Sequence, residues 1–159
     1  MKKEDIEPII STVAKVHKYG VKHRDIRIHN IMRDQALRHP ILLDWGFSVR
    51  EETNTSFCGG IDCAADEVLN KIGSGPGDAF EYKPEYDLIS FVRTVYIMLH
   101  APEDFHQLSF GKENTISEHA NNISDFWKCH AVSDLWNDMY CKANSLDYQG
   151  LIDLLKKLF

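Results

Sequence analysis

The residues best suited to chemistry lie in one polar stretch and in a triplet that follows it. The stretch reads His23-Arg24-Asp25-Ile26-Arg27-Ile28-His29-Asn30, and Asp44-Trp45-Gly46 begins 14 residues after Asn30. Phosphoryl transfer needs a carboxylate that orients the attacking hydroxyl, oxygen ligands for a magnesium ion, and a cation near the transferred group. Asp25 can supply the carboxylate, Asn30 and Asp44 the ligands, and Arg27 the cation.

Two short apolar runs adjoin these residues and predict how they are positioned. Ile31-Met32 follows Asn30 directly, and Ile41-Leu42-Leu43 precedes Asp44, with residues 33–40 between them. This pattern is typical of a small two-stranded ribbon. A loop before one strand and a turn after its neighbour would bring Asp25, Asn30 and Asp44 together.

The remaining pattern is mostly helical. Residues 4–19 form an amphipathic stretch that Gly20 ends, and 123–142 and 147–159 show further helical periodicity. Residues 87–99 are apolar in nearly every direction of a helical wheel, which predicts a buried central helix with Leu88, Val92 and Val95 among its least exposed residues. Residues 45–84 hold most of the glycines and predict extended loop with at best a short helix. The predicted fold class is mainly α with one small ribbon.

Composition narrows the class of protein. The chain has 159 residues, 43% of them hydrophobic, which fits a single globular domain. The net charge of −6 argues against nonspecific nucleic-acid binding, although residues 1–50 carry +4 and residues 51–159 carry −10. A basic segment suits a phosphate-bearing ligand, and a solvated basic helix explains it equally well. No apolar run is long enough to span a bilayer, and no secretory signal opens the chain. The four cysteines lack zinc-site spacing, so we expect reduced thiols and an intracellular protein that does not bind membranes.

The motifs resemble those of protein kinases. Residues 23–30 resemble the catalytic loop H-R-D-x-x-x-x-N, and Asp44-Trp45-Gly46 resembles the D-F-G metal-binding turn with tryptophan in the middle. Phe57-Cys58-Gly59-Gly60 and Ala65-Asp66-Glu67 resemble the end of an activation segment, with Asp66 where A-P-E has proline. Asp87 matches the aspartate that accepts hydrogen bonds from the catalytic-loop backbone in that family.

The resemblance implies the C-terminal lobe of a kinase fold, a helical bundle around a buried central helix, with the N-terminal lobe absent. It divides residues 1–159 into a helix before the catalytic loop (4–19), the catalytic loop and metal-binding turn (22–47), the activation segment (48–67), the central helix (87–99) and C-terminal helices (101–159). It implies ATP and Mg²⁺ as cofactors and a protein substrate. The implied site residues are Asp25 and Arg27 for catalysis, Arg27, Asn30 and Asp44 for the nucleotide, Asn30 and Asp44 for the metal, and His23, Arg24, Gly46, Glu67 and Asp87 for structure or regulation.

A narrower resemblance concerns crinkler-type proteins of oomycetes and fungi. Their kinase-like C-terminal domains are similar to this chain in the run 23–30 with Arg27, in Ile41-Leu42-Leu43-Asp44-Trp45-Gly46, in Ala65-Asp66-Glu67 and in residues 87–93. In that family such domains often act as effectors directed at a host.

The chain also departs from the kinase pattern. It contains no glycine-rich phosphate loop before a strand and no strand-borne V-A-I-K lysine, and Gly73-x-Gly75-x-Gly77 predicts only a flexible loop. We therefore expect weak Mg²⁺-ATP binding by the chain alone, and an apolar surface, with Trp45 and the face of helix 4–19 as candidates, that a small lobe or self-association covers. Arg93 either pairs with Glu67 or leaves it facing solvent.

The residues 53–56 leave a regulatory alternative open. Thr53, Thr55 and Ser56 are candidate phosphate acceptors, and Arg24 would bind such a phosphate. A polar loop beside Glu51 and Glu52 is the simpler interpretation.

Three functions compete. The first is the large lobe of a protein-kinase-like phosphotransferase. The second is a kinase-fold interaction or effector module without catalysis, which the missing lysine and phosphate loop favour. The third is a small-molecule phosphotransferase of the aminoglycoside- or choline-kinase type, which also uses H-x-D-x-x-x-x-N but lacks an activation segment like that of residues 57–67.

Overall fold

The structure, a computed structural model, describes residues 1–34, 36, 39–50, 54–75, 79–103, 105, 108 and 115–159, with residues 54 and 55 described by their backbone alone. Its helices and strands are, in chain order, α1 (Lys3–His17), β1 (Val21–Lys22), η1 (Ile28–Asn30), β2 (Ile31–Asp34), β3 (His39–Leu42), η2 (Trp45–Phe47), β4 (Val49–Arg50), β5 (Asn54–Thr55), α2 (Asp66–Gly73), β6 (Phe80–Glu81), α3 (Pro84–His100), α5 (Ile116–Cys129), α6 (Asp134–Asn144), α7 (Tyr148–Leu155) and η3 (Lys156–Leu158). The predicted fold class, mainly helical with little sheet, is confirmed.

Helix α3 is the centre of the core. Leu88, Val92 and Val95 are completely buried, as predicted from the apolar pattern. The helix begins three residues earlier than expected, at Pro84, because proline suits the first helical turn, where its missing N–H costs nothing. Burial on all sides ends at Val95, and the last residues of the helix, Leu99 and His100, are exposed.

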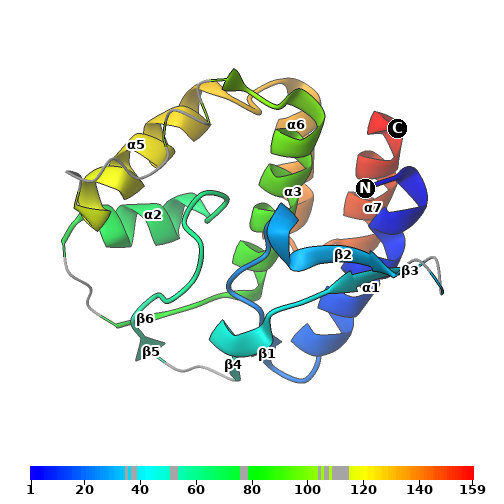
Figure 1. Ribbon diagram of the computed structural model, residues 1–159, viewed down its shortest axis with the longest axis horizontal. Helices are drawn as coiled ribbons and strands as arrows, with labels where there is room; N and C mark the ends of the chain where they lie inside the picture. Colours follow the sequence, from blue (N-terminus) through cyan, green and yellow to red (C-terminus); the bar gives the residue numbers. More distant parts are fainter. Residues whose placement is uncertain are drawn as a thin grey trace.

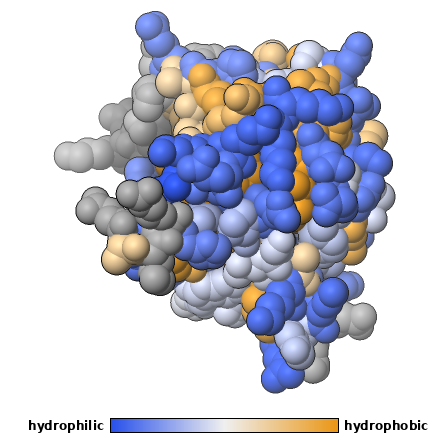
Figure 2. Space-filling view, turned by 90° about the vertical axis from the view of Figure 1, so that its right-hand side faces the viewer, coloured by the Kyte–Doolittle hydropathy of each residue, from blue (hydrophilic) through white to orange (hydrophobic). Residues whose placement is uncertain are grey.

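Helix α1 buries its apolar stripe against the core. Ile6, Ile9, Ile10 and Val13 recur at helical spacing and are at most 1% exposed. Gly20 follows the helix with a φ of 73°, a left-handed conformation that glycine adopts without strain. The side of the molecule on which α1 and α7 lie in Figure 1 is mostly hydrophilic in Figure 2. The prediction that the face of helix 4–19 provides exposed apolar surface is therefore wrong.

The sheet structure is more extensive than the sequence indicated. The predicted ribbon exists as β2 and β3, antiparallel, with Ile31 opposite Leu42 and Met32 opposite Ile41. Two further antiparallel pairs form, β1 with β4 and β5 with β6, and three of these strands, β4, β5 and β6, lie within residues 45–84, predicted as loop. Strands of two residues are too short to show a period of alternation, so the pattern did not reveal them. Helix α2 is the short helix expected within residues 45–84.

The single helix predicted over 123–142 is wrong. The chain forms two helices there, α5 and α6, and Ala131 between them has a φ of 55°. No glycine or proline marks this break, so the continuous apolar periodicity concealed it. The last predicted helix forms as α7 followed by the 3₁₀ turn η3, with Leu151 and Leu155 buried.

Figure 1 shows how these elements are arranged around the site. Helix α3 runs through the middle, α2 and α5 pack together on one side of it, and α1 and α7 pack together on the other, where both chain ends lie. The ribbon β2–β3 covers α1, and residues 22–30 pass between it and α3. No helix in the described part of the chain is long and apolar enough to cross a membrane.

Candidate active site

The carboxylate of Asp87 fixes the backbone of the polar stretch. Asp87, completely buried in the first turn of α3, accepts hydrogen bonds from the backbone N–H groups of His23 (2.6 Å) and Arg24 (2.9 Å). His17 Nε2 and the Tyr82 hydroxyl complete its shell at 3.0 Å and 3.2 Å. Burial, with the Asp87 charge as a second cause, raises the pKa of Tyr82 well above its usual value, so this hydroxyl stays a donor. The four donors offset the cost of burying the carboxylate.

His23 joins the polar stretch to the end of the ribbon. Its Nε2 lies 2.9 Å from the carbonyl of Leu43, and its Nδ1 accepts a hydrogen bond from the backbone N–H of Asp25 at 3.2 Å. A carbonyl only accepts and an amide only donates, so both contacts are satisfied by the tautomer with its proton on Nε2. Trp45 packs edge-on against the ring, with 4.5 Å between ring centroids, and donates its own N–H to Leu42. Trp45 is thus half-buried, so only part of its side chain is available for the exposed apolar surface predicted there.

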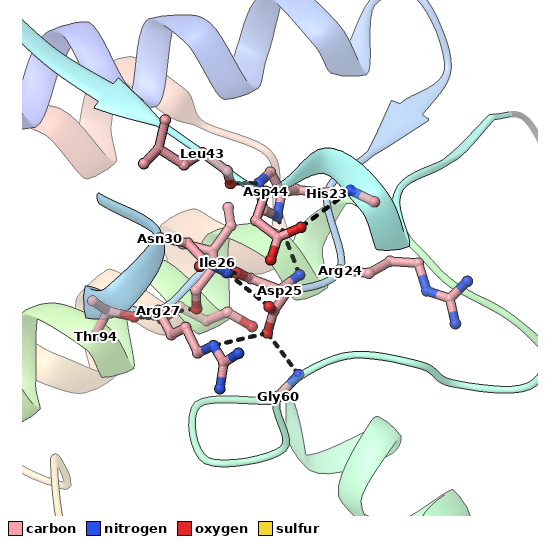
Figure 3. A network of polar contacts seen from close by, with 12 residues as sticks. His23, Arg24, Asp25, Ile26, Arg27, Asn30, Leu43, Asp44, Gly60 and Thr94 are labelled. Atoms are coloured by element: carbon pink, nitrogen blue, oxygen red, sulfur yellow. Dashed lines mark hydrogen bonds and ion pairs between the residues drawn. The ribbon is translucent and has the colours of Figure 1, made fainter. Parts of the chain in front are cut away.

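Asp25 lies at the centre of the site (Figure 3). One carboxylate oxygen accepts the backbone N–H of Gly60 at 2.6 Å and lies 3.2 Å from Nε of Arg27. The other accepts the side-chain amide of Asn30 at 2.7 Å. The side chain of Asp25 has no exposure, whereas that of Arg27 is 34% exposed. Asp25 is therefore oriented by three partners, two of which come from its own loop.

Asn30 and Asp44 present oxygen atoms on the same side of the site. The amide nitrogen of Asn30 donates to both the backbone and the side chain of Asp25, which leaves its amide oxygen for another partner. The carbonyl of Asn30 accepts a hydrogen bond from the N–H of Leu43. Because Asp44 is the next residue after Leu43, this bond keeps Asp44 close to Asn30. Figure 3 shows the Asp44 side chain directed toward Asp25 and Asn30. Asp44 is exposed, has a φ of 57°, and accepts the N–H of Gly46 at 3.4 Å.

Arg24 is engaged by the segment that precedes Gly60. Its guanidinium donates to the carbonyl of Ser56 at 2.6 Å and lies over the rings of Phe57 and Tyr82, 5.5 and 5.7 Å from their centroids. Ser56 itself is exposed. Thr53 and the side chain of Thr55, the other predicted phosphate acceptors, lie outside the described residues.

Glu67 does not have the partner that an A-P-E glutamate would have. It is exposed, and among the described residues no ion pair involves it. Arg93 instead donates to Asp66, the preceding residue, at 2.7 Å and to the carbonyl of Ala64. Of the two alternatives for Glu67, exposure is the one observed.

An apolar cavity of about 400 Å³ lies next to this centre. Gly59 and Ile61, the neighbours of Gly60, form part of its wall, and Phe57, Ile72, Phe80 and Ile116 are among the apolar residues that line the rest. The cavity therefore begins one residue away from the group that contacts Asp25. It is large enough for one bulky side chain.

Comparison with known proteins decides the family. The sequence profile of the protein kinase domain matches residues 2–159, nearly the whole chain. The chain belongs to the protein kinase domain family. Among curated relatives, the serine/threonine-protein kinase ppk25 of Schizosaccharomyces pombe is 30% identical over 64% of this chain. Calcium-dependent protein kinase SK5 of Glycine max is 32% identical over 76% of it, and human myotonin-protein kinase 29% over 70%.

This kinase-family chain spans only a small part of those relatives. The matches cover 23%, 25% and 19% of the three proteins, respectively. Each of these relatives is therefore several times longer than the part that this chain matches.

Several residues at this kinase-family site were not predicted from sequence. They are His17, Tyr82 and Thr94, together with the backbone N–H of Gly60. Arg93 was considered from the sequence only as a partner of Glu67, whereas its observed partners are Asp66 and the carbonyl of Ala64. Gly60 acts through its backbone, which no side-chain pattern reveals.

Proposed function

We propose that this chain is the large, C-terminal lobe of a protein kinase that phosphorylates serine or threonine hydroxyls of a protein. The observation that carries the proposal is the orientation of Asp25 by Asn30, Arg27 and Gly60, with Asp44 beside them. The name of the relative ppk25, a serine/threonine-protein kinase, supports the choice of hydroxyl.

The donor set fits a magnesium nucleotide. The amide oxygen of Asn30 and the carboxylate of Asp44 are hard oxygen ligands of the kind Mg²⁺ takes. In the described part of the chain no three His, Cys, Asp or Glu side chains gather into a metal site. Two protein ligands suit a magnesium ion whose remaining ligands are phosphates and water. When bound, Mg²⁺-ATP supplies the phosphoryl group and neutralises the charge of its own phosphates.

The side chains of the chain itself have distinct tasks. Asp25 orients the attacking hydroxyl and accepts its proton at a carboxylate oxygen. Arg27, one-third exposed, ion-pairs with Asp25 and directs positive charge to the side on which the transferred group arrives. Asp87 and His23 keep the loop in place so that Asp25 does not need to reorganise.

The apolar cavity supports a polypeptide as the substrate. A chain whose hydroxyl approaches Asp25 can place a nearby apolar side chain against Phe57, Ile61 and Phe80. This observation and the family membership favour a protein kinase over the small-molecule phosphotransferases considered from the sequence.

A catalytically inactive module is the second candidate, and one observation favours it. Both oxygens of Asp25 are occupied and the side chain is not exposed, so no hydroxyl reaches it in this conformation. The Arg27 side chain, which is 34% exposed, must move before Asp25 can act. The resemblance to crinkler-type domains, and with it an effector role, rests on the motif residues alone and accompanies this second candidate.

The test is a phosphate-transfer assay on the chain joined to a kinase small lobe, with a generic protein substrate. Replacing Asp25 by alanine should lower turnover by roughly 10²–10⁴-fold, as expected for removal of a general base. The variant Glu67→Gln is the control, because its side chain lies in solvent. Turnover that is unaffected by Asp25→Ala rules out the proposed role, and a complete lack of turnover in the parent favours the inactive module.

A further inference from the structure

The ion pair between Arg93 and Asp66 lies near the site but has no role in the proposed function. Arg93 is 2% exposed and lies within the otherwise apolar helix α3. A buried guanidinium needs partners for its charge, and these are the carboxylate of Asp66 and the carbonyl of Ala64. Nε of Arg93 has no hydrogen-bond partner among the described residues, so the two terminal nitrogens carry the polar contacts.

Two aromatic rings restrict the guanidinium further. The ring of Trp127, on α5, lies 4.7 Å from the guanidinium carbon, and the ring of Tyr140, on α6, lies 5.8 Å from it. Trp127 also donates its indole N–H to the carbonyl of Asp62 at 2.9 Å. Helices α3, α5 and α6 therefore converge on residues 62–66 through Arg93.

Residues 62–66 follow closely after Gly60, the residue that contacts Asp25. Gly60, whose N–H contacts Asp25, lies four residues before Ala64, and Ile61 between them is buried. The residue after Arg93, Thr94, donates to the carbonyl of Ile26, the neighbour of Asp25, at 3.3 Å. Adjacent residues of α3 thus hold both the catalytic loop and the segment that faces it.

We propose that Arg93, through Asp66 and the Ala64 carbonyl, is a positioning residue that sets the Gly60 amide against the carboxylate of Asp25. The inference rests on the proposed function for the role of Asp25. In this proposal Asp66 forms the ion pair that holds the end of residues 60–66, and Glu67 takes no part in that ion pair. The partner of the segment is then an arginine of the central helix itself.

Asp66 and Glu67 provide a matched pair for the test. Both are acidic, both are exposed, and both lie in the first turn of α2, so each loses the same interaction with the helix dipole when neutralised. Only Asp66 contacts Arg93. The variants Asp66→Asn and Glu67→Gln therefore differ mainly in what they do to the buried guanidinium.

The readout is native-state hydrogen exchange, followed by NMR, at the amides of Gly60 and Ile61. The buried amides of Leu88 and Val92 serve as internal references for global unfolding. Asp66→Asn should speed exchange at Gly60 by about tenfold and leave the references unchanged, because it removes the counter-charge of a buried ion. Glu67→Gln should change none of these rates by more than about twofold.

Other results overturn the proposal. Faster exchange in Glu67→Gln instead of Asp66→Asn assigns the ion pair to Glu67. Equal acceleration at Gly60, Leu88 and Val92 in Asp66→Asn shows an effect on global stability without positioning, and no acceleration shows that Asp66 is dispensable. The hydrogen-exchange experiment needs no nucleotide. Its result can therefore be interpreted even if the phosphate-transfer assay shows no activity.

The functional consequence is tested in the same form of the protein that is used for phosphate transfer. Asp66→Asn should lower kcat by about tenfold with little change in KM for ATP, because it loosens the Gly60 contact that orients Asp25 and leaves Asn30 and Asp44 in place. Asp66→Glu, which restores the charge, should recover part of that loss. A change confined to KM, or no recovery with glutamate, contradicts a positioning role.

Discussion

The groups that orient the carboxylate of Asp25 also shield it from solvent. Its two oxygens contact Gly60, Arg27 and Asn30, and glycine at 60 is what permits the closest of these contacts. A Cβ atom at Gly60 would lie 2.7 Å from the carboxylate and 3.1 Å from Cδ of Arg27. A Cβ atom at Gly59 would collide with the backbone carbonyl of Arg24.

These two glycines should therefore respond differently to alanine. In Gly60→Ala the obstacles are side-chain atoms, the Asp25 carboxylate and the end of Arg27, which shift more easily than backbone, and we expect a loss of about 1 kcal/mol in the free energy of unfolding. In Gly59→Ala the obstacle is backbone, and we expect about 3 kcal/mol. Urea unfolding measures both values. A Gly60→Ala variant that is the less stable of the two contradicts this account of the loop.

Asp87 is the residue on which the position of the loop most depends. Replacing it by alanine leaves the amides of His23 and Arg24 buried without an acceptor, which should cost about 1–3 kcal/mol for each unsatisfied group. Glu85→Ala, in the same first turn of α3 but only partly buried, is the control for the helix dipole. Urea unfolding that shows equal effects for the two variants would remove Asp87 from its structural role.

At the scale of elements, α3 organises the molecule because it is buried for most of its length. Val92 is completely buried, whereas Leu99, two turns later, is 37% exposed. An unpaired charge at position 92 would be buried away from water, whereas one at position 99 can be hydrated.

We accordingly expect Val92→Asp to prevent folding and Leu99→Asp to be tolerated. The measurement is circular dichroism with thermal melting of both variants. A cooperative transition for Val92→Asp within a few degrees of the parent would show that α3 is less central than its burial indicates.

The sequence predicts elements with strong periodicity and misses those without it. The apolar stripe of α1 and the all-round pattern of α3 locate both helices to within a few residues. The break between α5 and α6 has no glycine or proline, and β1, β4, β5 and β6 are two residues each, so neither leaves a pattern. Motif spacing predicts that Asp25 and Asn30 lie together, since five residues separate them.

Contacts between the loop and the later segment are a different case. Gly60 reaches Asp25 across 35 residues, and Arg24 reaches Ser56 across 32, both through backbone atoms. Backbone groups carry no residue identity, so no sequence pattern encodes these pairings. The sequence likewise does not indicate that Arg93 pairs with Asp66 instead of Glu67, because either of these neighbouring carboxylates can balance its charge.

For the molecule as a whole, buried groups that must stay neutral limit stability at high pH. Burial raises the pKa of the Cys63 thiol from 9.0 to about 12. The unfolded chain therefore loses this proton at lower pH than the folded one, so stability is complete below pH 9 and falls as the pH rises toward 12. The thiol alone should contribute a slope of up to about 1.4 kcal/mol per pH unit.

The check is urea unfolding at a series of pH values from neutral to alkaline. Cys63→Ala should flatten the alkaline decline, and Cys58→Ala, whose thiol is exposed, should not. A Cys63→Ala curve parallel to that of the parent would show that this thiol is not buried in the folded protein.

The central claim is the proposal that Asn30 and Asp44 form a magnesium-nucleotide site in which Asp44 is exposed to water. In such an open site water screens each interaction, so binding should be weak. The most direct test is calorimetric titration of the 159-residue chain with Mg²⁺-ATP, beside Asp44→Ala and the control Glu67→Gln. We expect Kd in the high micromolar range or weaker, about −5 kcal/mol or less favourable, with binding dependent on Mg²⁺, lost in Asp44→Ala and retained in Glu67→Gln. Binding that is indifferent to Asp44 or to Mg²⁺ would contradict the account.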